Sequence, residues 1–474
     1  MVTIETEDHE DLNAQPWVYQ GSDGGIRINR QALYKYLKEN TSFRVSDRGN
    51  IYYYDGKLYH LITDREFKAT IKDYLPVEFR RSRDWVSVFE EYKSDHPDLI
   101  ESSLDADEDL IGFTNGVLKL STMELVPYSE DIMLSRMVPS KYLPKQTLSD
   151  APIFDAFLNQ LVCEDPMEKQ FILEYLGAII SNVCGYRFKK MLILVGAGNT
   201  GKSVLRSLAI QLVGEDNCST IELKRLQERF GTFQLYQKRL AGSGDMSNLE
   251  ISDLNVAKEL TGGDPIMVEQ KGKDGFTFLY RGFLWFNANQ LPFFRGDRGM
   301  HVYERFMIVR CENVVPEDKR DSQLVEKLMG ERDAIASIAV DALKLAVQQG
   351  YTFTESECMM LEREQYAINN NSLFLFISDC CCLHAMDKLE IKRSEFNKVY
   401  KEYCKVNNLK PEREREIGHQ LKEQYNIMAY KSNGIYYYPL EIYEDSYNVI
   451  SPEHYYVSGD QKRRKRPTVT IIGQ

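Results

Sequence analysis

One stretch, MLILVGAGNTGKSVLRSLAIQLVG at 191–214, constrains the fold more than any other part of this chain. Met191 to Val195 is an apolar, branched run that predicts a buried strand, and Val204 to Val213 predicts a helix. The residues between them match G-x-x-x-x-G-K-[ST]: Gly196, Ala197, Gly198, Asn199, Thr200, Gly201, Lys202 and Ser203. Glycines let a loop fold closely around phosphate oxygens, and the amides at a helix N-terminus face negative charge. The stretch predicts a phosphate-binding loop in an α/β core, with a plain Gly-rich turn as the alternative.

Residue types in and near this loop assign the chemistry. Lys202 can reach the β and γ phosphates of a nucleotide, and the Ser203 hydroxyl can ligate Mg2+. A nucleoside triphosphatase built on such a loop also needs an acid at the end of a neighbouring strand. Asp245 follows the short run Leu240 to Gly244, so it is the candidate that holds Mg2+ through water. A turn aspartate without a metal is the alternative. We predict ATP and Mg2+ as the bound groups, with residues 196–204 forming the nucleotide site.

A second segment predicts a β-hairpin with a basic tip. Pro265 to Gln270 and Phe276 to Tyr280 are strand-like, and Lys271 and Lys273 lie in the turn between them. Basic hairpin tips suit phosphate contacts that follow a nucleic-acid backbone without reading bases. A solvated surface turn is the alternative.

The next strand and its sequel carry two more candidates. The run FLWFNANQLP at 283–292 is an apolar strand that ends in asparagine, and such an amide can hold an attacking water or the γ phosphate. Arg305 precedes the apolar run Phe306 to Val309, and a guanidinium offered to a neighbour's γ phosphate would stabilise transition-state charge. An ordinary ion pair is the alternative for Arg305.

The C-terminal residues predict a small separate module. Ile391 to Val406 and Glu412 to Tyr425 have helical patterns, and two strand-like runs flank an Asn433-Gly434 turn. Helices followed by a hairpin form a winged-helix pattern, a variant of the helix-turn-helix. The DNA-contact candidates are Arg415, Lys422 and Lys431. Because the second helix also carries three glutamates, a protein-binding winged helix is the alternative.

Charge and composition limit the remaining classes. The net charge of −12 argues against a protein that coats nucleic acid everywhere, but it allows a local basic channel. No run approaches the roughly 18 apolar residues of a membrane helix, and the acidic start is no secretory signal, so we expect no membrane contact and a cytoplasmic location in a bacterial host. Cys380, Cys381 and Cys382, followed by His384, predict a buried helix face rather than a zinc site. Asp105 and Asp107 predict a solvated acidic linker, and the run 462–466 adds phosphate affinity.

The order of these motifs resembles superfamily 3 helicases, specifically the phage and plasmid primase-helicase family related to poxvirus primase-helicases. The resemblance covers about residues 105–460 and includes LIGFTNGVLKLSTMELVPYSED at 110–131. It implies an AAA+ fold, a homo-hexameric ring and ATP-driven translocation on DNA, 3′ to 5′. By position, Lys202 and Ser203 are the Walker A pair, Asp245 the Walker B acid, and Lys271 with Lys273 the pore hairpin. Asn289 takes the sensor 1 place, because it stands directly before Gln-Leu-Pro, and Arg305 is the arginine finger.

One position departs from the family pattern, because Gly244 stands where many members have a second acid beside Asp245. The water-activating group is therefore unassigned. We predict a helicase and replication initiator that binds single- and double-stranded DNA, including a replication origin, and that works with a separate primase or host replication protein. The alternative is a DNA-associated nucleoside triphosphatase that acts as a switch or remodeller without unwinding DNA. The predicted parts are an accessory domain (1–104), a helicase-associated segment and helical collar (105–184), the AAA+ core (185–350), a helical linker (351–385) and a winged-helix domain with a basic tail (386–474).

Overall fold

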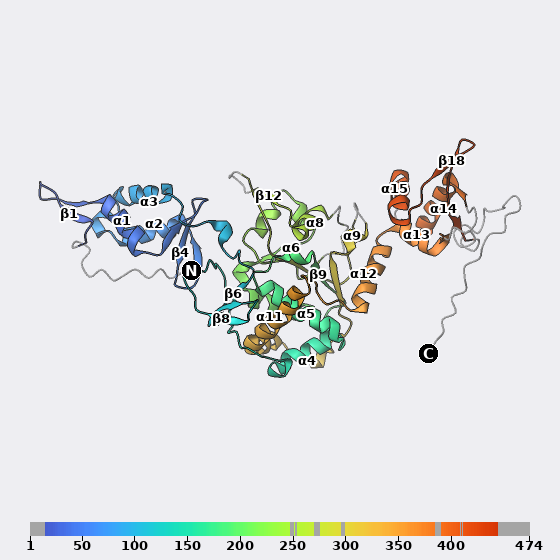
Figure 1. Ribbon diagram of the computed structural model, residues 1–474, viewed down its shortest axis with the longest axis horizontal. Helices are drawn as coiled ribbons and strands as arrows, with labels where there is room; N and C mark the ends of the chain where they lie inside the picture. Colours follow the sequence, from blue (N-terminus) through green and yellow to red (C-terminus); the bar gives the residue numbers. More distant parts are fainter. Residues whose placement is uncertain are drawn as a thin grey trace. The chain divides into compact units, whose positions relative to one another are not determined.

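The computed structural model describes residues 15–246, 251, 254–269, 275–294, 299–383, 390–407, 409 and 411–443. The chain divides into two compact units, and the labelled helices and strands of each can be followed in Figure 1. Unit 1 comprises residues 1–246, 259–289 and 309–355, and unit 2 comprises residues 247–258, 290–308 and 356–474. Within the described ranges, no helix has both the length and the apolar character that crossing a membrane requires.

The N-terminal part of unit 1 is an α/β assembly with an apolar core of its own. Strand-like runs on both sides of Asp55-Gly56 predict a hairpin and residues 31–40 predict an amphipathic helix, and the structure contains both. Trp17, Leu33 and Phe67 are fully buried in this core. The elements are β1 (Val18–Gln20), β2 (Ile26–Ile28), α1 (Arg30–Asn40), β3 (Phe43–Val45), β4 (Ile51–Tyr54), β5 (Tyr59–Ile62), α2 (Asp64–Asp73) and α3 (Asp84–Ser94).

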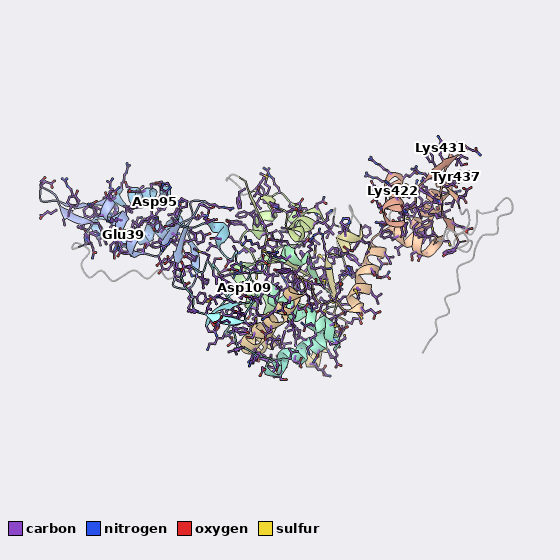
Figure 2. All side chains as sticks on the ribbon, in the orientation of Figure 1. Glu39, Asp95, Asp109, Lys422, Lys431 and Tyr437 are labelled. Carbon is purple, nitrogen blue, oxygen red and sulfur yellow. The ribbon has the colours of Figure 1, made fainter. Side chains whose placement is uncertain are left out.

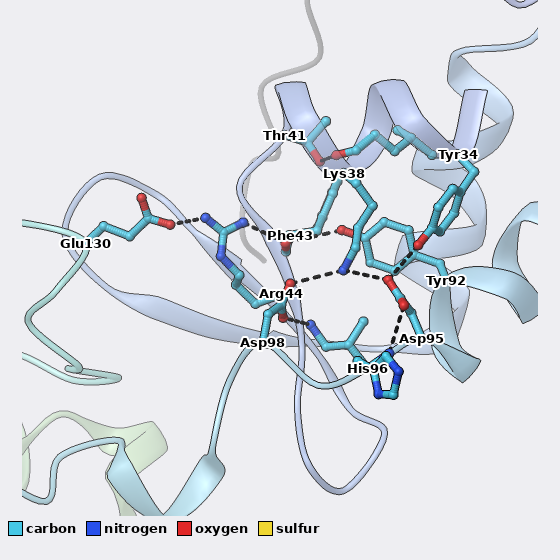
Figure 3. Close-up of polar contacts among 12 residues, drawn as sticks. Tyr34, Lys38, Thr41, Phe43, Arg44, Tyr92, Asp95, His96, Asp98 and Glu130 are labelled. Atoms are coloured by element: carbon cyan, nitrogen blue, oxygen red, sulfur yellow. Dashed lines mark hydrogen bonds and ion pairs between the residues drawn. The ribbon is translucent and has the colours of Figure 1, made fainter. Parts of the chain in front are cut away.

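A polar network joins the end of α3 to α1 in this part, as Figure 3 shows. The Tyr34 hydroxyl donates to the Asp95 carboxylate at 2.5 Å, and Lys38 Nζ lies 3.1 Å from oxygens of both Asp95 and Asp98. The hydrogen bond from Tyr34 is the main reason why the pKa of Asp95 falls to about 2, and Lys38 adds to the effect. The network stabilises the charged carboxylate at neutral pH.

A three-stranded antiparallel sheet follows, formed by β6 (Leu110–Phe113), β7 (Gly116–Lys119) and β8 (Glu124–Val126). The prediction of a solvated acidic linker before it was wrong for Asp105. This carboxylate is buried, accepts a hydrogen bond from the Ser135 amide at 2.9 Å and lies 3.5 Å from the Arg136 guanidinium. Asp107, in contrast, is exposed as predicted. A buried carboxylate needs such partners, and sequence spacing does not reveal them.

The centre of unit 1 is a five-stranded sheet with the order β10-β11-β14-β9-β15. Its strands are β9 (Met191–Val195), β10 (Cys218–Thr220), β11 (Leu240–Gly242), β14 (Phe283–Ala288) and β15 (Phe306–Arg310). The pairings β10–β11, β11–β14 and β14–β9 are parallel, which confirms the predicted α/β core with a parallel sheet. β14 lies between β9 and β11, so the segments that follow these three strands meet at one edge.

Helices pack against this sheet in the same unit (Figure 1). The sequence from Ile153 to Val183 has a helical pattern, and the structure forms two helices there, of which the second, α5, has 11 of its 15 residues buried. Gly177 of α5 lies against α11, where an added Cβ would sit 2.1 Å from the Ala339 carbonyl oxygen. The helices are α4 (Pro152–Leu161), α5 (Pro166–Ile180), α6 (Gly185–Phe188), α7 (Lys202–Val213), α10 (Leu324–Gly330) and α11 (Arg332–Gln348).

The sequence pattern from Glu326 to Gln349 predicts one long helix, and this prediction is wrong in one respect, because the helix is broken at Glu331. The Glu331 carboxylate accepts hydrogen bonds from the backbone amides of Ile153 and Phe154, at 3.0 and 2.9 Å. These amides belong to the first turn of α4, which has no intrahelical acceptors for them. The break thus coincides with a capping contact to a helix far away in the sequence.

A buried arginine ties the helices to the sheet behind the loop. Arg239, 1% exposed, directly precedes β11 and donates to the carbonyls of Ile179 at 3.1 Å, Val183 at 2.6 Å and Arg281 at 2.6 Å. It also donates to the Ala178 carbonyl. Burial lowers the pKa of this guanidinium, and the backbone oxygens replace the water that it loses.

Unit 2 combines two helices with the segment around residues 290–303. The Asn370 amide group donates to the Phe294 carbonyl at 3.2 Å and to the Tyr303 hydroxyl at 2.9 Å, while the Tyr366 hydroxyl donates to the Pro292 carbonyl. The sequence pattern from Glu357 to Leu383 predicts one long helix, which is wrong, because Asn371 caps a new helix by accepting from the amides of Leu373 and Phe374. The elements are α8 (Asn255–Gly262, shared between the units), α9 (Met300–Tyr303), α12 (Glu357–Asn369) and α13 (Ser372–Cys380).

The C-terminal part of unit 2 has its own apolar core, which includes Phe376, Phe396, Ile417 and Tyr438. Both predicted helices and the predicted hairpin with its Asn-Gly turn are confirmed as secondary structure. The three consecutive cysteines Cys380, Cys381 and Cys382 are buried as predicted, but only Cys380 is helical, and the other two form a short strand. His384 lies outside the described residues. The elements are β16 (Cys381–Cys382), β17 (Ile391–Lys392), α14 (Arg393–Val406), α15 (Glu414–Tyr425), β18 (Tyr430–Ser432), β19 (Ile435–Tyr438) and β20 (Glu441–Ile442).

Candidate functional site

The loop between β9 and α7 has a backbone path that its glycines make accessible. Gly196 has a φ of +152°, and a Cβ added there would lie 2.1 Å from the Cys311 carbonyl oxygen. Gly201 has a φ of +99° and directly precedes α7. At Gly198, by contrast, an added Cβ would meet open space. The loop is thus fixed at its ends by close packing and open in its middle, where a ligand can approach the backbone.

Lys202 is the first residue of α7, and its side chain is buried within the loop. Its Nζ donates to the carbonyls of Gly196 and Ala197, both at 2.6 Å, and to the Thr200 hydroxyl at 3.2 Å. The pKa of Lys202 is lowered overall. Burial is the main cause, and the nearby Cys311 and Asp245 side chains oppose it in part. The Ser203 side chain, one residue further on, is exposed. A cation and a hydroxyl therefore stand together at the N-terminus of a twelve-residue helix.

Asp245 reaches the same edge because the chain after β11 is held against β14. The Asn287 amide donates to the Ser243 carbonyl at 3.0 Å, and the Met246 amide donates to the Asn287 carbonyl at 2.7 Å. These two bonds bracket the Gly244-Asp245 pair. Asp245 therefore lies just after β11, on the same edge of the parallel sheet as the loop that follows β9.

Gly244, the position where an adjacent acid is absent, lies beside a buried arginine. A Cβ added at Gly244 would be 3.8 Å from Cδ and Nε of Arg206, an ordinary contact distance. Arg206 donates to the carbonyls of Gly242 at 2.7 Å and Trp285 at 3.4 Å. The space beside Asp245 is therefore bounded by a structural guanidinium.

The two asparagines of β14 and its end differ in environment. Asn287 is 1% exposed within the strand, and its Oδ1 accepts a hydrogen bond from Trp285 Nε1 at 3.0 Å. Within the described part of the chain, its Nδ2 has no hydrogen-bond partner. Asn289 follows the last residue of β14 and is exposed. Asn289 is thus placed at the carboxyl end of the strand between β9 and β11, where the sensor prediction requires a polar side chain.

The structure does not bring the other predicted site residues, Arg305, Lys271 and Lys273, together at one described site. Arg305 belongs to unit 2, is partly buried, and donates from Nη1 to the Lys258 carbonyl at 3.2 Å. The hairpin is confirmed by β12 (Ile266–Val268) and β13 (Phe276–Phe278), but Lys271 and Lys273 lie outside the described residues. The strand β13 packs on Tyr236, whose ring centroid is 4.9 Å from that of Phe276.

The predicted DNA contacts of the C-terminal part lie on two different elements. Arg415 and Lys422 are exposed on α15, and Lys431 is exposed on β18, as Figure 2 shows for the two lysines. Acids share the surface of α15, and one of them, Glu414, forms an ion pair with Lys401 at 3.3 Å. Sequence reasoning missed the exposed tyrosines of the β18–β19 hairpin, although the run Ile435-Tyr436-Tyr437-Tyr438 beside a turn was a usable signal.

The residues at the loop fit ATP and Mg2+ on the chemistry of their side chains. The loop offers backbone amides and a buried cation to phosphates, and Gly198 leaves room for their approach. Across the residues that the structure describes, no three His, Cys, Asp or Glu side chains gather into a metal cluster. Mg2+ needs no such cluster, because it commonly takes one or two protein oxygens and completes its shell from phosphate and water.

Comparisons with known proteins find two family profiles in this chain. The profile described as "D5 N terminal like" matches residues 17–163, and the "Family of unknown function (DUF5906)" matches residues 194–305. Among solved structures, the A form apo structure of the NrS-1 C terminal region is 13% identical, with a TM-score of 0.45, and the match covers 86% of this chain and 98% of that chain. An apo structure of the same region is 14% identical, with a TM-score of 0.44, at 86% and 98% coverage. The chain therefore carries a D5-like N-terminal segment ahead of its loop-bearing sheet.

Proposed function

We propose that this chain is an ATP-driven DNA helicase that serves replication of a phage or mobile genetic element. The observation that carries the proposal is that the loop with Lys202 and Ser203 follows β9 while Asp245 follows β11, at the same carboxyl edge of the parallel sheet. The D5-like match at 17–163 supports it, since the motif order resembles primase-helicases of that kind. In this proposal the core has the AAA+ fold, the subunits form a hexameric ring, and translocation runs 3′ to 5′.

The residues of the loop would each take a defined part in nucleotide hydrolysis. Bound ATP and Mg2+ supply the phosphoryl chemistry and the charge neutralisation. Lys202 turns from the carbonyls of Gly196 and Ala197 toward the phosphates, and Ser203 and Asp245 hold the cation. Asn289 orients the attacking water from the end of β14.

Two further parts would couple hydrolysis to DNA. Arg305 acts on the site of a neighbouring subunit, and the hairpin that carries Lys271 and Lys273 contacts one DNA strand. Because β13 packs on Tyr236, movement in the sheet region has a direct mechanical path to this hairpin. The helices α13–α15 and the sheet β17–β19–β18 form a winged-helix domain in this proposal.

Strand displacement on a forked DNA duplex, with ATP and Mg2+, tests the proposal. We expect displacement by the wild-type chain, none by Lys202→Ala, and normal displacement by Lys224→Ala, which removes an exposed lysine outside the site. Intact ATP hydrolysis that is neither stimulated by single-stranded DNA nor linked to displacement would contradict the helicase assignment. It would favour the nucleoside triphosphatase switch.

A mixing experiment tests the trans role of Arg305. Lys202→Ala and Arg305→Ala subunits should each be inactive alone. In a random mixture, roughly a quarter of the interfaces join an intact Lys202 to an intact Arg305, so that fraction of ATPase activity should return. No recovery from a mixture that demonstrably co-assembles would refute the arginine-finger assignment.

A further inference from the structure

The hairpin of β18 and β19 is held rigidly to the C-terminal core. Its turn residues Asn433 and Gly434 both have positive φ, at 48° and 81°, which suits a two-residue hairpin turn. β19 also pairs with β17, and Tyr438 is 1% exposed with its ring centroid 5.2 Å from that of Phe396. The buried tyrosine and the two pairings fix the register of the hairpin.

One face of this small sheet presents aromatic rings to solvent. Tyr430 pairs directly with Tyr437 across the strands, and their rings are stacked at a centroid distance of 5.8 Å and an interplanar angle of 24°. Tyr430 is on the edge strand and is 39% exposed, and Ile435 on the same face is 42% exposed. We name Tyr430, Tyr437 and Lys392, which pairs with Tyr437 from the other side, the tyrosine face.

The charged residues of the three strands are both lysines, and they lie on opposite faces of the sheet. Lys392 belongs to the tyrosine face, whereas Lys431 pairs with Tyr436 on the other face, where its Nζ lies 5.6 Å from the ring centroid of Tyr436, which is 47% exposed. Helix α15 differs, because its exposed surface mixes lysine and arginine with Glu416 and Glu423. A phosphate backbone is attracted by the hairpin, whereas the acids of α15 oppose it.

We propose that the tyrosine face binds unpaired bases of a single-stranded nucleic acid. Bases stack on Tyr430 and Tyr437, and Lys392 contacts the phosphates beside them. Every base has a π-face, so such a platform tolerates any sequence. This inference rests on the proposed function for its DNA ligand. It assigns the main DNA contact of the C-terminal part to the hairpin instead of to α15.

Fluorescence anisotropy of the full chain, without nucleotide, tests the platform. Three probes of equal length are compared: labelled oligo(dT), an abasic single strand and a blunt duplex. Tyr430→Ala and Tyr437→Ala should each weaken oligo(dT) binding by about 5- to 150-fold and leave abasic-strand binding unchanged. Tyr437→Phe keeps the ring and should bind normally. Tyr19→Ala, which removes another exposed tyrosine, should also bind normally.

Each other result overturns the inference. Equal losses on oligo(dT) and the abasic strand would show that the rings serve phosphate contacts or folding. A loss confined to the duplex would assign the hairpin to double-stranded DNA, and no loss on any probe would leave a protein as the occupant. Strand displacement by the same variants separates the two proposals, because base stacking without displacement by the wild type refutes the helicase and retains the platform.

Discussion

Replacing Gly196 by alanine should destabilise the core locally, and the structure sets the size of the effect. The new Cβ would lie 2.1 Å from the Cys311 carbonyl oxygen, so two backbone segments must separate by roughly 1 Å to restore contact distance. The two adjacent hydrogen bonds, Gly196 N to Ala288 O and Cys311 N to Val195 O, would be strained or lost. A Gly-only φ costs about 1–3 kcal/mol and each bond about 0.5–1.5 kcal/mol, so we expect a total of roughly 2–6 kcal/mol.

Gly198→Ala is the matched control, because it adds the same methyl group to the same loop in open space. It should change stability by less than about 0.5 kcal/mol. Native-state hydrogen exchange of the β9 and β14 amides, measured against urea without nucleotide, reports the local free energy of opening. Because no nucleotide is present, an effect of Gly198→Ala on phosphate binding does not enter the readout. Equal stability of the two variants would refute the packing argument.

Three other substitutions have outcomes that simple measurements check. Arg239→Leu removes the guanidinium donor from four carbonyls, of which those of Arg281 and Ala178 keep donors from Gly185 and Ser181, and it should cost at least about 2 kcal/mol, measured by urea unfolding, with Arg239→Lys intermediate. Gly177→Ala should force α5 from the Ala339 carbonyl and lower the calorimetric melting temperature by several degrees. Tyr34→Phe should flatten the loss of stability on acidification: the Asp95 pKa is depressed from 3.8 to about 2, chiefly by Tyr34, and because this carboxylate is accessible to solvent its contribution is screened to about 1 kcal/mol or less, which exists above pH 4 and fades as pH falls toward 2. An acid-unfolding profile unchanged by Tyr34→Phe would contradict this assignment.

The predictable part of this chain is the part in which local sequence carries the constraint. The loop at 196–203 was predictable because glycines, a lysine and a hydroxyl follow each other between two apolar runs. The hairpin around Asn433-Gly434 was predictable because its turn needs two residues with positive φ. In both cases, neighbours in the sequence are also the interacting partners.

The unpredicted features depend on partners that are distant in the sequence. The helix break at Glu331 serves amides of α4, nearly 180 residues earlier, and Asn370, just before α13, donates to the Phe294 carbonyl, 76 residues earlier. The burial of Asp105 depends on Ser135 and Arg136. Periodicity cannot show such contacts, because it records only which face of an element is apolar.

Among the site residues, the structure places Lys202 after β9 and Asp245 after β11 at one edge of the sheet, while the roles of Asn289, Arg305, Lys271 and Lys273 stay predictions. The role of Asn287 was not visible in sequence. Its backbone, rather than its amide group, positions the segment that carries Asp245, and any residue type can supply a backbone amide and carbonyl. Contacts of this kind leave no signature in side-chain identity.

The pairing of α5 with α11 also has a consequence for synthesis on the ribosome. α5 ends at Ile180 and its partner ends at Gln348, so the ribosome adds 168 residues between them, which takes roughly 8–34 s at 5–20 residues per second. Throughout that interval a helix destined for burial on nearly all sides lacks its cover. The nascent chain is therefore exposed to aggregation at this helix, and slowed translation between 180 and 348 should increase its demand for chaperones.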